Sequence, residues 1–344
     1  MKLGIKEVAR RANVSIATVS RVLNGSELVT DETREAVMKV VKDLNYRPNA
    51  IGRALVTQKT NLLGVILPDV HSEFFSELIR GIDEAARQHK YHIIVASTHS
   101  DKKEIESMLS VMQGGRVDGL IIMSPHIDTK EVLKHLSPHS RVIFVNSYLN
   151  GSHFDSVSID NFGGAYQMVT HLIGHGHKKI GILKGEELNH DARERYSGYL
   201  KALKENSIKP GGNWELEGNF TEESGYELMM KLLKQKSKPT AVFCSNDSMA
   251  LGALSALHEI DIIVPGEIAI AGFDDVPLAR YVLPSLTSVH VPIYELGMAA
   301  VEKMFDVSAR RDGAAGIRKV LSTSIVKRES CGCPQEAKEE VPVT

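Results

Sequence analysis

The chain has 344 residues, of which 42% are hydrophobic and 24% charged, so its composition excludes a disordered chain and a fibrous repeat. Its length favours two or three domains. The net charge of −2 hides an asymmetry, since residues 1–60 carry eleven Lys and Arg against six Asp and Glu. A basic head on an acidic body indicates a nucleic-acid-binding module joined to another domain, although a charged stretch is often only a solvated surface.

Three features of the chain predict a cytoplasmic protein. Charged residues in the first eleven positions stand where a signal peptide needs an apolar stretch. No apolar run approaches the roughly 20 residues that span a bilayer. The chain has three cysteines, Cys244, Cys331 and Cys333. An odd and small number of cysteines does not form a disulfide framework, and it fits a protein of a reducing compartment.

Residues 1–48 are predicted to form three short helices. Ser15 follows a tight turn and can act as the N-cap of a second helix over residues 16–24. Thr30 can cap a third helix, whose apolar residues repeat at i, i+3, i+4 and i+7 before Pro48 stops the pattern. This arrangement predicts a helix-turn-helix domain, whose second helix fits the major groove of DNA.

The outward-facing residues of the second helix are the expected DNA contacts. Arg21 can donate two hydrogen bonds to guanine, while Ile16 and Ala17 can contact a thymine methyl group. Phosphate contacts, which position the protein without specifying a sequence, are expected from Lys6, Thr18, Ser20 and Asn24.

Three stretches of this head resemble the signature of LacI/GalR-type bacterial repressors: Ile5–Ala9, Val14–Asn24 and Leu44–Ala50. The resemblance implies a bacterial transcriptional repressor, associated with the nucleoid when bound to DNA. It also implies a homodimer on double-stranded operator DNA, and the operator should be pseudo-palindromic because the half-sites mirror the two-fold symmetry of the protein.

Residues 49–61 are predicted to form a hinge helix and linker. The resemblance implies that this helix folds on DNA, pairs with its dimer mate and inserts Leu55 into the minor groove, with Arg53 near the phosphates. A helix of about nine residues is unstable alone, and Gly52 weakens it by about 1 kcal/mol relative to alanine. A leucine wedge would kink the duplex. The alternative is a plain linker with a structural leucine.

From Leu62 short aliphatic runs alternate with amphipathic stretches, which predicts parallel sheets built from βαβ units. The expected strands are 62–67, 92–96, 120–123, 142–145, 180–183, 241–244 and 268–271. The expected helices are 73–88, 104–113, 163–173, 196–205, 222–233 and 248–258.

Residues 62–330 resemble the sugar-type periplasmic-binding-protein fold. The resemblance implies an α/β effector-binding and dimerisation core of two lobes, each a mostly parallel sheet flanked by helices, behind the small all-α head. Lobe one is expected at about 62–161 and 292–322, and lobe two at about 162–291 and 323–330. The polar composition after Cys333 favours a disordered tail, which we place at 331–344.

Polar and aromatic residues at strand ends predict a ligand site in the cleft between the lobes. Aromatic rings beside Asn, Asp and Arg suit a sugar or a nucleoside. By resemblance, Arg195, Asn246 and Asp274 match the positions that most often contact the effector. More variable pocket positions are matched by Phe74, Asn146, Asn189, Asp191 and Phe220. Asp274 could instead cap a turn, and Arg195 could form a surface ion pair.

The main hypothesis is therefore a repressor controlled by a small polar effector, a sugar or sugar derivative. The alternative within the family is a catabolite-control-type regulator driven by a protein corepressor, whose pocket commonly lacks the arginine found here as Arg195. The basic head argues against a sugar-binding transport component. The sequence lacks a catalytic motif, so we expect no enzymatic activity, no cofactor and no membrane association.

Two motifs contain metal-ligating residue types, but neither motif by itself supplies a complete set of metal ligands. The stretch with His171, His175 and His177 favours a helix C-terminus, where glycine ends the helix and histidine lies near its negative pole. Cys331 and Cys333 supply only two of the four ligands of a structural zinc site. The sequence therefore predicts no metal site.

Overall fold

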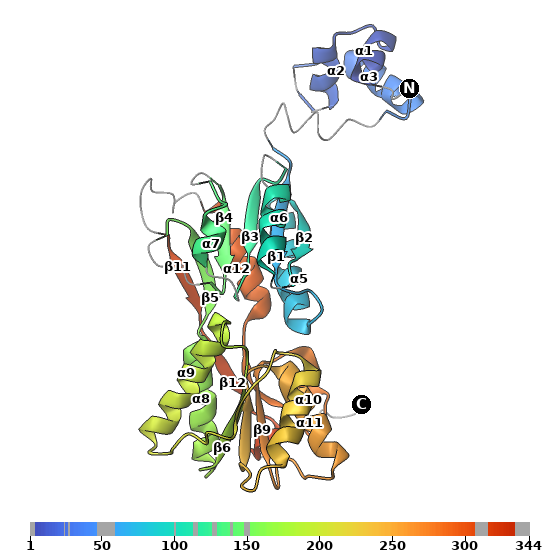
Figure 1. The fold of residues 1–344 in the computed structure, drawn as a ribbon. Helices are drawn as coiled ribbons and strands as arrows, with labels where there is room; N and C mark the ends of the chain where they lie inside the picture. The colour runs from blue at the N-terminus through green and yellow to red at the C-terminus, as the bar shows by residue number, and fades with distance from the viewer. Residues whose placement is uncertain are drawn as a thin grey trace, which may run out of the picture. The chain divides into compact units, whose positions relative to one another are not determined.

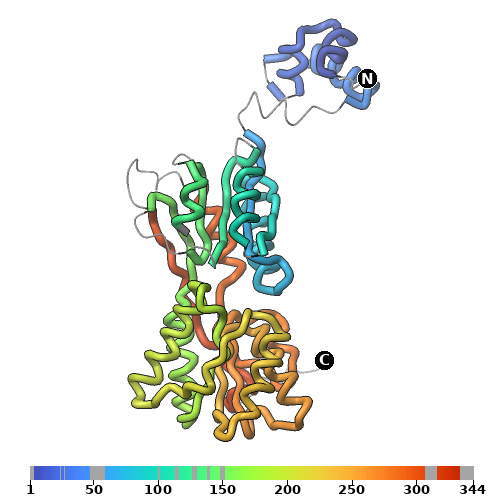
Figure 2. The backbone as a smooth tube through the Cα atoms, viewed as in Figure 1, coloured from blue at the N-terminus to red at the C-terminus, as the bar shows by residue number. Residues whose placement is uncertain are grey.

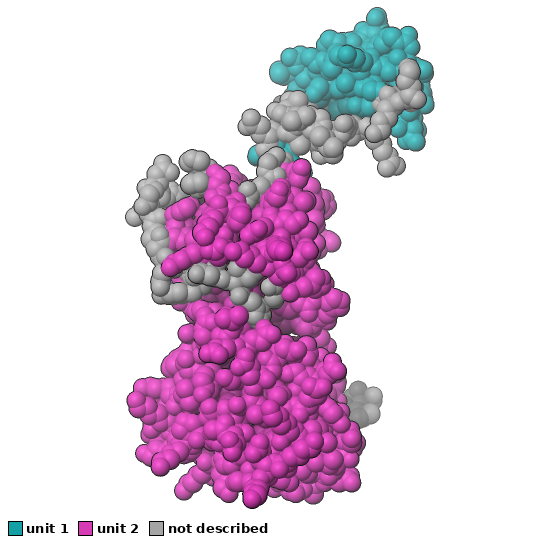
Figure 3. Space-filling model, viewed as in Figure 1, with its two compact units in different colours: residues 1–60 teal, residues 61–344 magenta. Residues whose placement is uncertain are grey.

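The computed structural model describes residues 4–23, 25–26, 28–46, 59–99, 101–112, 116–125, 129–137, 140–147, 152–306 and 316–333. The chain divides into two compact units, unit 1 over residues 1–60 and unit 2 over residues 61–344 (Figure 3). Within the described ranges, none of the helices combines the length and the apolar character needed to cross a membrane.

The described residues of unit 1 form three helices, α1 (Ile5–Arg11), α2 (Ile16–Leu23) and α3 (Asp31–Asp43). Ser15 Oγ accepts a hydrogen bond from the Thr18 amide at 3.0 Å and so caps α2, and the Thr30 side chain caps α3. The turn before α2 contains Asn13 in the left-handed region, with φ of 52°. A small core holds the helices together and consists of Val8, Ala9, Val19, Val22 and Val37.

The described part of unit 2 contains two sheets, one in each lobe (Figure 1). Each of them has six strands. The first has the order β11-β5-β4-β3-β1-β2, and all of its neighbouring strands are parallel. Its strands are β1 (Leu62–Leu67), β2 (His92–Ser97), β3 (Gly119–Ile122), β4 (Val142–Val145), β5 (Asp155–Ile159) and β11 (Arg318–Leu321).

The second sheet has the order β12-β10-β9-β8-β6-β7 and is parallel except for the antiparallel pair β10–β12. Its strands are β6 (Ile180–Lys184), β7 (Glu215–Glu217), β8 (Ala241–Cys244), β9 (Ala269–Asp274), β10 (Thr287–His290) and β12 (Ser324–Val326). Two mostly parallel sheets confirm the fold class expected from the alternating pattern.

Helices cover both faces of each sheet because successive strand residues point to opposite faces. Val65 packs in a cluster with α5 and α12, whereas its neighbour Ile66 packs in another cluster with α6 and α7. The helices of lobe one are α5 (Glu73–Gln88), α6 (Lys102–Met112), α7 (Thr129–Leu133) and α12 (Ile293–Phe305). Those of lobe two are α8 (Asn161–Gly174), α9 (His190–Glu205), α10 (Glu222–Leu233) and α11 (Asp247–Glu259), with the short 3₁₀ helices η1 (Pro277–Arg280) and η3 (Glu329–Cys331).

The chain passes between the two sheets three times, after β5, between β10 and α12, and between β11 and β12 (Figure 2). Each lobe is therefore completed by a segment that comes from far along the sequence. All seven expected strands have an observed counterpart. Strands β5, β7, β10, β11 and β12 were not expected, nor were α7 and α12.

The beginning of the predicted tail requires correction. The sequence placed a disordered tail at 331–344, but η3 extends through Cys331, and Cys331 is buried with an exposed fraction of 1%. The backbone is anchored here because Ser330 Oγ donates to the Ile270 carbonyl at 2.7 Å and accepts from the Thr287 amide at 2.9 Å. The described chain continues to Cys333, and residues 334–344 lie outside it. Most of the predicted hinge, residues 49–58, also lies outside the described residues.

Candidate functional site

A cavity of about 490 Å³ lies in unit 2, between the loops that follow β1–β3 in lobe one and β6–β9 in lobe two. This is the carboxyl edge of both sheets, where open α/β folds bind ligands. Seven of the eight predicted effector residues line it: Phe74, Asn189, Asp191, Arg195, Phe220, Asn246 and Asp274.

Asn146 is the predicted residue that does not line this cavity. It lies in an adjacent hollow of about 50 Å³, together with Asn161 and Arg318. Its Oδ1 accepts a hydrogen bond from the Ile159 amide at 3.2 Å, so the side chain joins the end of β4 to β5. Its Nδ2 is buried and has no hydrogen-bond partner among the described residues, so a contact between Asn146 and an effector stays a prediction.

Arg195 on α9 is buried, with an exposed fraction of only 4%, which excludes the alternative of a surface ion pair. Its Nε donates to Asn161 Oδ1 at 2.8 Å, and its Nη1 donates to the carbonyl of Ser245. The Cζ atom lies 3.8 Å from the centre of the Phe273 ring. The guanidinium therefore connects α8, α9 and the ends of β8 and β9.

Asp274, the last residue of β9, faces Arg195 across the wall of the cavity. Its Oδ1 lies 3.4 Å from Arg195 Nη2, which is an ion pair but too long for a good hydrogen bond. Among the described residues Oδ1 has no hydrogen-bond partner. Burial raises the pKa of Asp274 to about 7, while the guanidinium of Arg195 lowers it and the carboxylate of Asp191 raises it. A buried carboxyl group with spare acceptor capacity is thus presented to the cavity.

Asp191 contributes a second carboxylate to the cavity wall. Its Oδ1 accepts a hydrogen bond from Asn161 Nδ2 at 2.9 Å, and Asn161 in turn accepts from Arg195. This chain of contacts fixes the orientation of the Asn161 amide, whose carbonyl oxygen must face the guanidinium. The three side chains form one polar network along the wall.

Two of the predicted asparagines also have a structural role. Asn189 Oδ1 accepts from the Ala192 amide at 3.1 Å and caps α9. Asn246 Oδ1 accepts from the Met249 amide at 3.0 Å and caps α11, while its Nδ2 donates to the Phe220 carbonyl at 2.9 Å. Both residues line the cavity while their side chains hold its loops.

Asp247, which follows β8 beside Asn246, supports the site from behind and does not line the cavity. Its carboxylate is fully buried and accepts hydrogen bonds from Ser288 Oγ at 2.6 Å and from the Val276 amide at 2.9 Å. Burial, aided by the nearby Asp274, raises its pKa well above the usual range. Asp247 therefore fixes the loop that begins at Asp274.

The sequence analysis did not predict several residues that line the cavity, above all those in the loop after β1. Among them are Asp69, His71 and Ser72 from lobe one and Glu186 and Asn219 from lobe two. The signal that could have found them is their position just after a strand, because such loops converge at the carboxyl edge of a parallel sheet. Asn161 was missed because its partner Arg195 is 34 residues away.

In unit 1 the predicted DNA contacts lie on the outer side of α1 and α2. Ile16 has an exposed fraction of 44%, and Lys6, Ala17 and Arg21 are also exposed, whereas Thr18 and Ser20 are half-buried. Val19 and Val22 on the inner side of α2 pack in the core of the domain. The residues on its outer side are therefore available to contact a groove of DNA. Asn24, Arg53 and Leu55 lie outside the described residues.

Comparison with known proteins gives matches to both units. Residues 4–49 match the bacterial regulatory proteins of the lacI family, and residues 169–331 match a periplasmic binding protein-like domain. The chain is 38% identical over 309 residues to the HTH-type transcriptional repressor PurR of Haemophilus influenzae (strain PittEE), covering 90% of this chain and 92% of that protein. It is 38% identical over 304 residues to catabolite control protein A of Priestia megaterium, covering 88% and 91%.

Solved structures are similar over almost the whole chain. The lac repressor dimer bound to operator and the anti-inducer ONPF has a TM-score of 0.86 at 29% identity, covering 96% of this chain and 99% of that one. The complex of the transcriptional regulator CelR with cellobiose has a TM-score of 0.71 at 28% identity, covering 95% and 99%.

The raised pKa of Asp274 predicts a pH-dependent stability that Asp274→Asn should remove. Between about pH 4 and pH 7 the unfolded chain releases this proton and the native chain keeps it, so wild-type stability falls as the pH rises. The stability of the wild type relative to the variant should therefore fall by at most about 4 kcal/mol across this range, and urea unfolding of both proteins would measure it. A difference that does not change with pH would mean that Asp274 is already ionised at the acid end.

Proposed function

The chain belongs to the lacI family of bacterial regulatory proteins, and from this premise we propose a homodimeric repressor of a pseudo-palindromic operator, controlled by a sugar-like effector in the cleft. Its relatives are DNA-binding transcriptional regulators, which confirms the expectation that the protein is not an enzyme. The nature of the effector and the mode of operator binding are the proposed part.

The pair formed by Arg195 and Asp274 is the observation that carries the effector proposal. Arg195 can donate from Nη2 and Asp274 can accept at Oδ1, and the two atoms are 3.4 Å apart at the cavity wall. A hydroxyl group both accepts and donates, so one hydroxyl can satisfy both side chains. Burying such groups without a partner is unfavourable, and a ligand hydroxyl would relieve that cost.

The remainder of the cavity also favours a sugar. Its volume of about 490 Å³ lies within the usual range of small-molecule sites. Phe74 and Phe220 offer aromatic surface from opposite lobes, on which the apolar face of a sugar ring can pack. Sugars are bound by similar structures, since a complex of CelR with cellobiose and a family member from Enterococcus faecium with bound ribose are both known.

Control of DNA binding would follow from contacts to both lobes. A ligand held by Phe74 of lobe one and by Arg195 and Asp274 of lobe two binds best in one arrangement of the lobes. It shifts the protein toward that arrangement by its difference in affinity for the two states, and by no more. In a dimer, the relation between the two lobes can then change the relation between the two hinge segments and so the fit to the operator.

Operator recognition is assigned to α2, with Arg21 as the base-reading residue and Leu55 as the wedge in the minor groove. Exposure of Arg21, Ile16 and Ala17 beside a core formed by the other face of α2 supports this assignment. The similar lac repressor structure is a dimer bound to operator, which supports the proposed dimer.

We predict that Arg21→Ala weakens binding to the selected operator by about 1–3 kcal/mol, the worth of one bidentate contact to guanine. The operator is first selected from a random duplex pool with the wild-type protein, and affinities are then measured by fluorescence anisotropy at fixed salt. Lys103→Ala is the matched control, because it removes the same charge from an exposed residue of unit 2.

Equal losses in Arg21→Ala and Lys103→Ala would contradict the role of α2. So would a wild-type protein that selects no site and binds random and selected duplexes alike.

We predict that one class in a panel of sugars, sugar phosphates and nucleosides raises the melting temperature of the protein, because a ligand that binds only the native state stabilises it by mass action. Arg195→Met should lose this shift, since the methionine fills similar space without donating a hydrogen bond. Asp274→Ala should lose it as well. Glu104→Ala, at an exposed position on α6, is the control that should keep the shift.

A shift that survives in Arg195→Met and Asp274→Ala would place the ligand elsewhere. No shift with any compound would favour the alternative of a protein corepressor over a sugar-like effector.

A further inference from the structure

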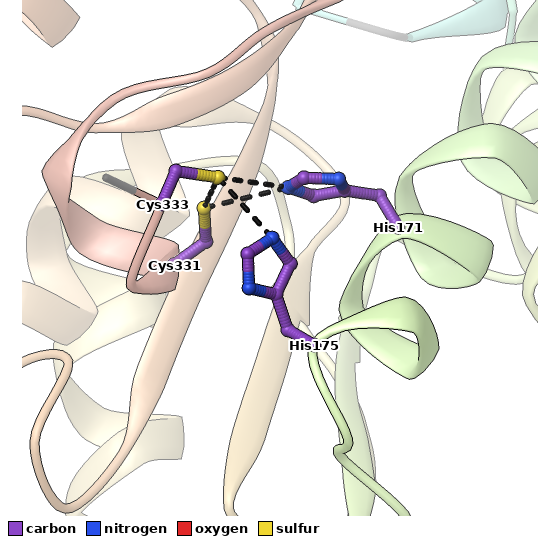
Figure 4. A group of neighbouring side chains, drawn as sticks. All are labelled: His171, His175, Cys331 and Cys333. Carbon is purple, nitrogen blue, oxygen red and sulfur yellow. Dashed lines mark hydrogen bonds between the residues drawn. The ribbon is translucent and has the colours of Figure 1, made fainter. Parts of the chain in front are cut away.

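Four metal-ligating side chains that are distant in the sequence meet at the end of α8 away from the cavity (Figure 4). His171 lies in the last turn of α8 and His175 is its C-cap residue. Cys331 is the last residue of η3, and Cys333 follows two positions later. One ligand atom from each residue lies within 4.8 Å of every other. We call these four residues the His–Cys cluster.

Local structure explains how each half of the cluster is formed. Histidines four residues apart lie on one face of a helix, so the rings of His171 and His175 reach the same space from the end of α8. Between the cysteines Gly332 adopts the left-handed region with φ of 80°, which turns the chain sharply. Both sulfur atoms therefore point toward the two imidazole rings (Figure 4).

The distances within the cluster are close to those of a tetrahedral metal site. Zn–S bonds of about 2.3 Å and Zn–N bonds of about 2.0 Å place neighbouring ligand atoms about 3.3–3.8 Å apart in a tetrahedron. His171 Nε2 is 3.5 Å from Cys331 Sγ and 3.2 Å from Cys333 Sγ, and His175 Nε2 is 3.4 Å from Cys333 Sγ. The two sulfur atoms are 2.9 Å apart and would have to separate to about 3.8 Å around an ion.

We propose that His171, His175, Cys331 and Cys333 form a structural zinc site. Two thiolates and two imidazoles are the donor set of closed, four-coordinate zinc sites, which leave no position for a reactant. The sequence weighed the histidine motif and the cysteine motif separately and predicted no metal. Neither motif is sufficient alone, and their distance in the sequence, 162 positions from His171 to Cys333, conceals that they meet in the fold.

The proposed zinc would attach the C-terminal segment to the frame of lobe two. Thr287 Oγ1 on β10 donates to Cys331 Sγ at 3.1 Å, and the preceding Ser330 bonds to the backbone of Ile270 and Thr287. The same α8 begins at Asn161, which holds Arg195 in the cavity wall. Zinc would therefore fasten one end of a helix whose other end supports the ligand site.

Metal analysis of the full-length protein, purified under reducing conditions without chelator, tests this proposal. We expect one zinc per chain by mass spectrometry. Apoprotein titrated with Co²⁺ should show the intense absorption of tetrahedral cobalt bound to thiolate, with an end point at one equivalent, and Zn²⁺ should displace the cobalt. Added Zn²⁺ should also raise the melting temperature of the apoprotein.

Variants then assign the ligands. His175→Ala is the main variant, because His175 is exposed and its loss leaves the core intact. This change and Cys333→Ser should each abolish stoichiometric binding and weaken the cobalt absorption. His177→Ala is the matched control: His177 lies on the same stretch but contacts Thr240 Oγ1 at 3.0 Å and is outside the cluster.

Wild-type protein that purifies without zinc and gives no thiolate–cobalt absorption would overturn the proposal. Stoichiometric binding that persists in both His175→Ala and Cys333→Ser would also overturn it, as would a disulfide between Cys331 and Cys333 in the reduced preparation. None of these outcomes depends on DNA or effector binding.

Discussion

The buried guanidinium of Arg195 is the constraint around which lobe two is arranged. A charge removed from water must be surrounded by acceptors, and here these acceptors come from three elements. Asn161 begins α8, Ser245 follows β8 and Asp274 ends β9. The face of Phe273 covers the remaining side. The start of α8 and the ends of β8 and β9 must therefore keep their positions if Arg195 is to stay buried. The same arrangement leaves Asp274 Oδ1 free to accept a hydrogen bond from a ligand in the cavity.

This frame explains why a ligand could act on the whole protein. Arg195 and Asp274 belong to lobe two, whereas Phe74 comes from the loop after β1 in lobe one, so a ligand between them senses how the lobes are arranged. Three passages of the chain connect the lobes. Helix α8 also supports the site, because its first residue holds Arg195 and its C-terminal end carries two of the four proposed zinc ligands.

The sequence predicted the elements whose signals are local. The apolar run Leu62–Leu67 indicates β1 on its own, and the positions just after such strands identified seven of the residues that line the cavity. Strand β10 (Thr287–His290) was missed because the polar Ser288 within it is stabilised by residues distant in the sequence, the carboxylate of Asp247 and the amide of Asp275. The roles of Asn161 and of the His–Cys cluster were not predicted for the same reason, since each depends on a partner far along the chain. Asn146 also follows a strand, but it lies beside the cavity because its Oδ1 accepts a hydrogen bond from the Ile159 amide.

The most direct test of the account is the affinity of the cleft ligand measured with and without saturating operator DNA. Coupling between two sites is reciprocal, so the operator must change ligand affinity by the same factor by which the ligand changes operator affinity. The account predicts two different affinities in the wild-type protein, with a ratio that matches the change in operator binding. Equal ligand affinities in the two conditions would contradict it, because a ligand that binds both states alike cannot control either of them.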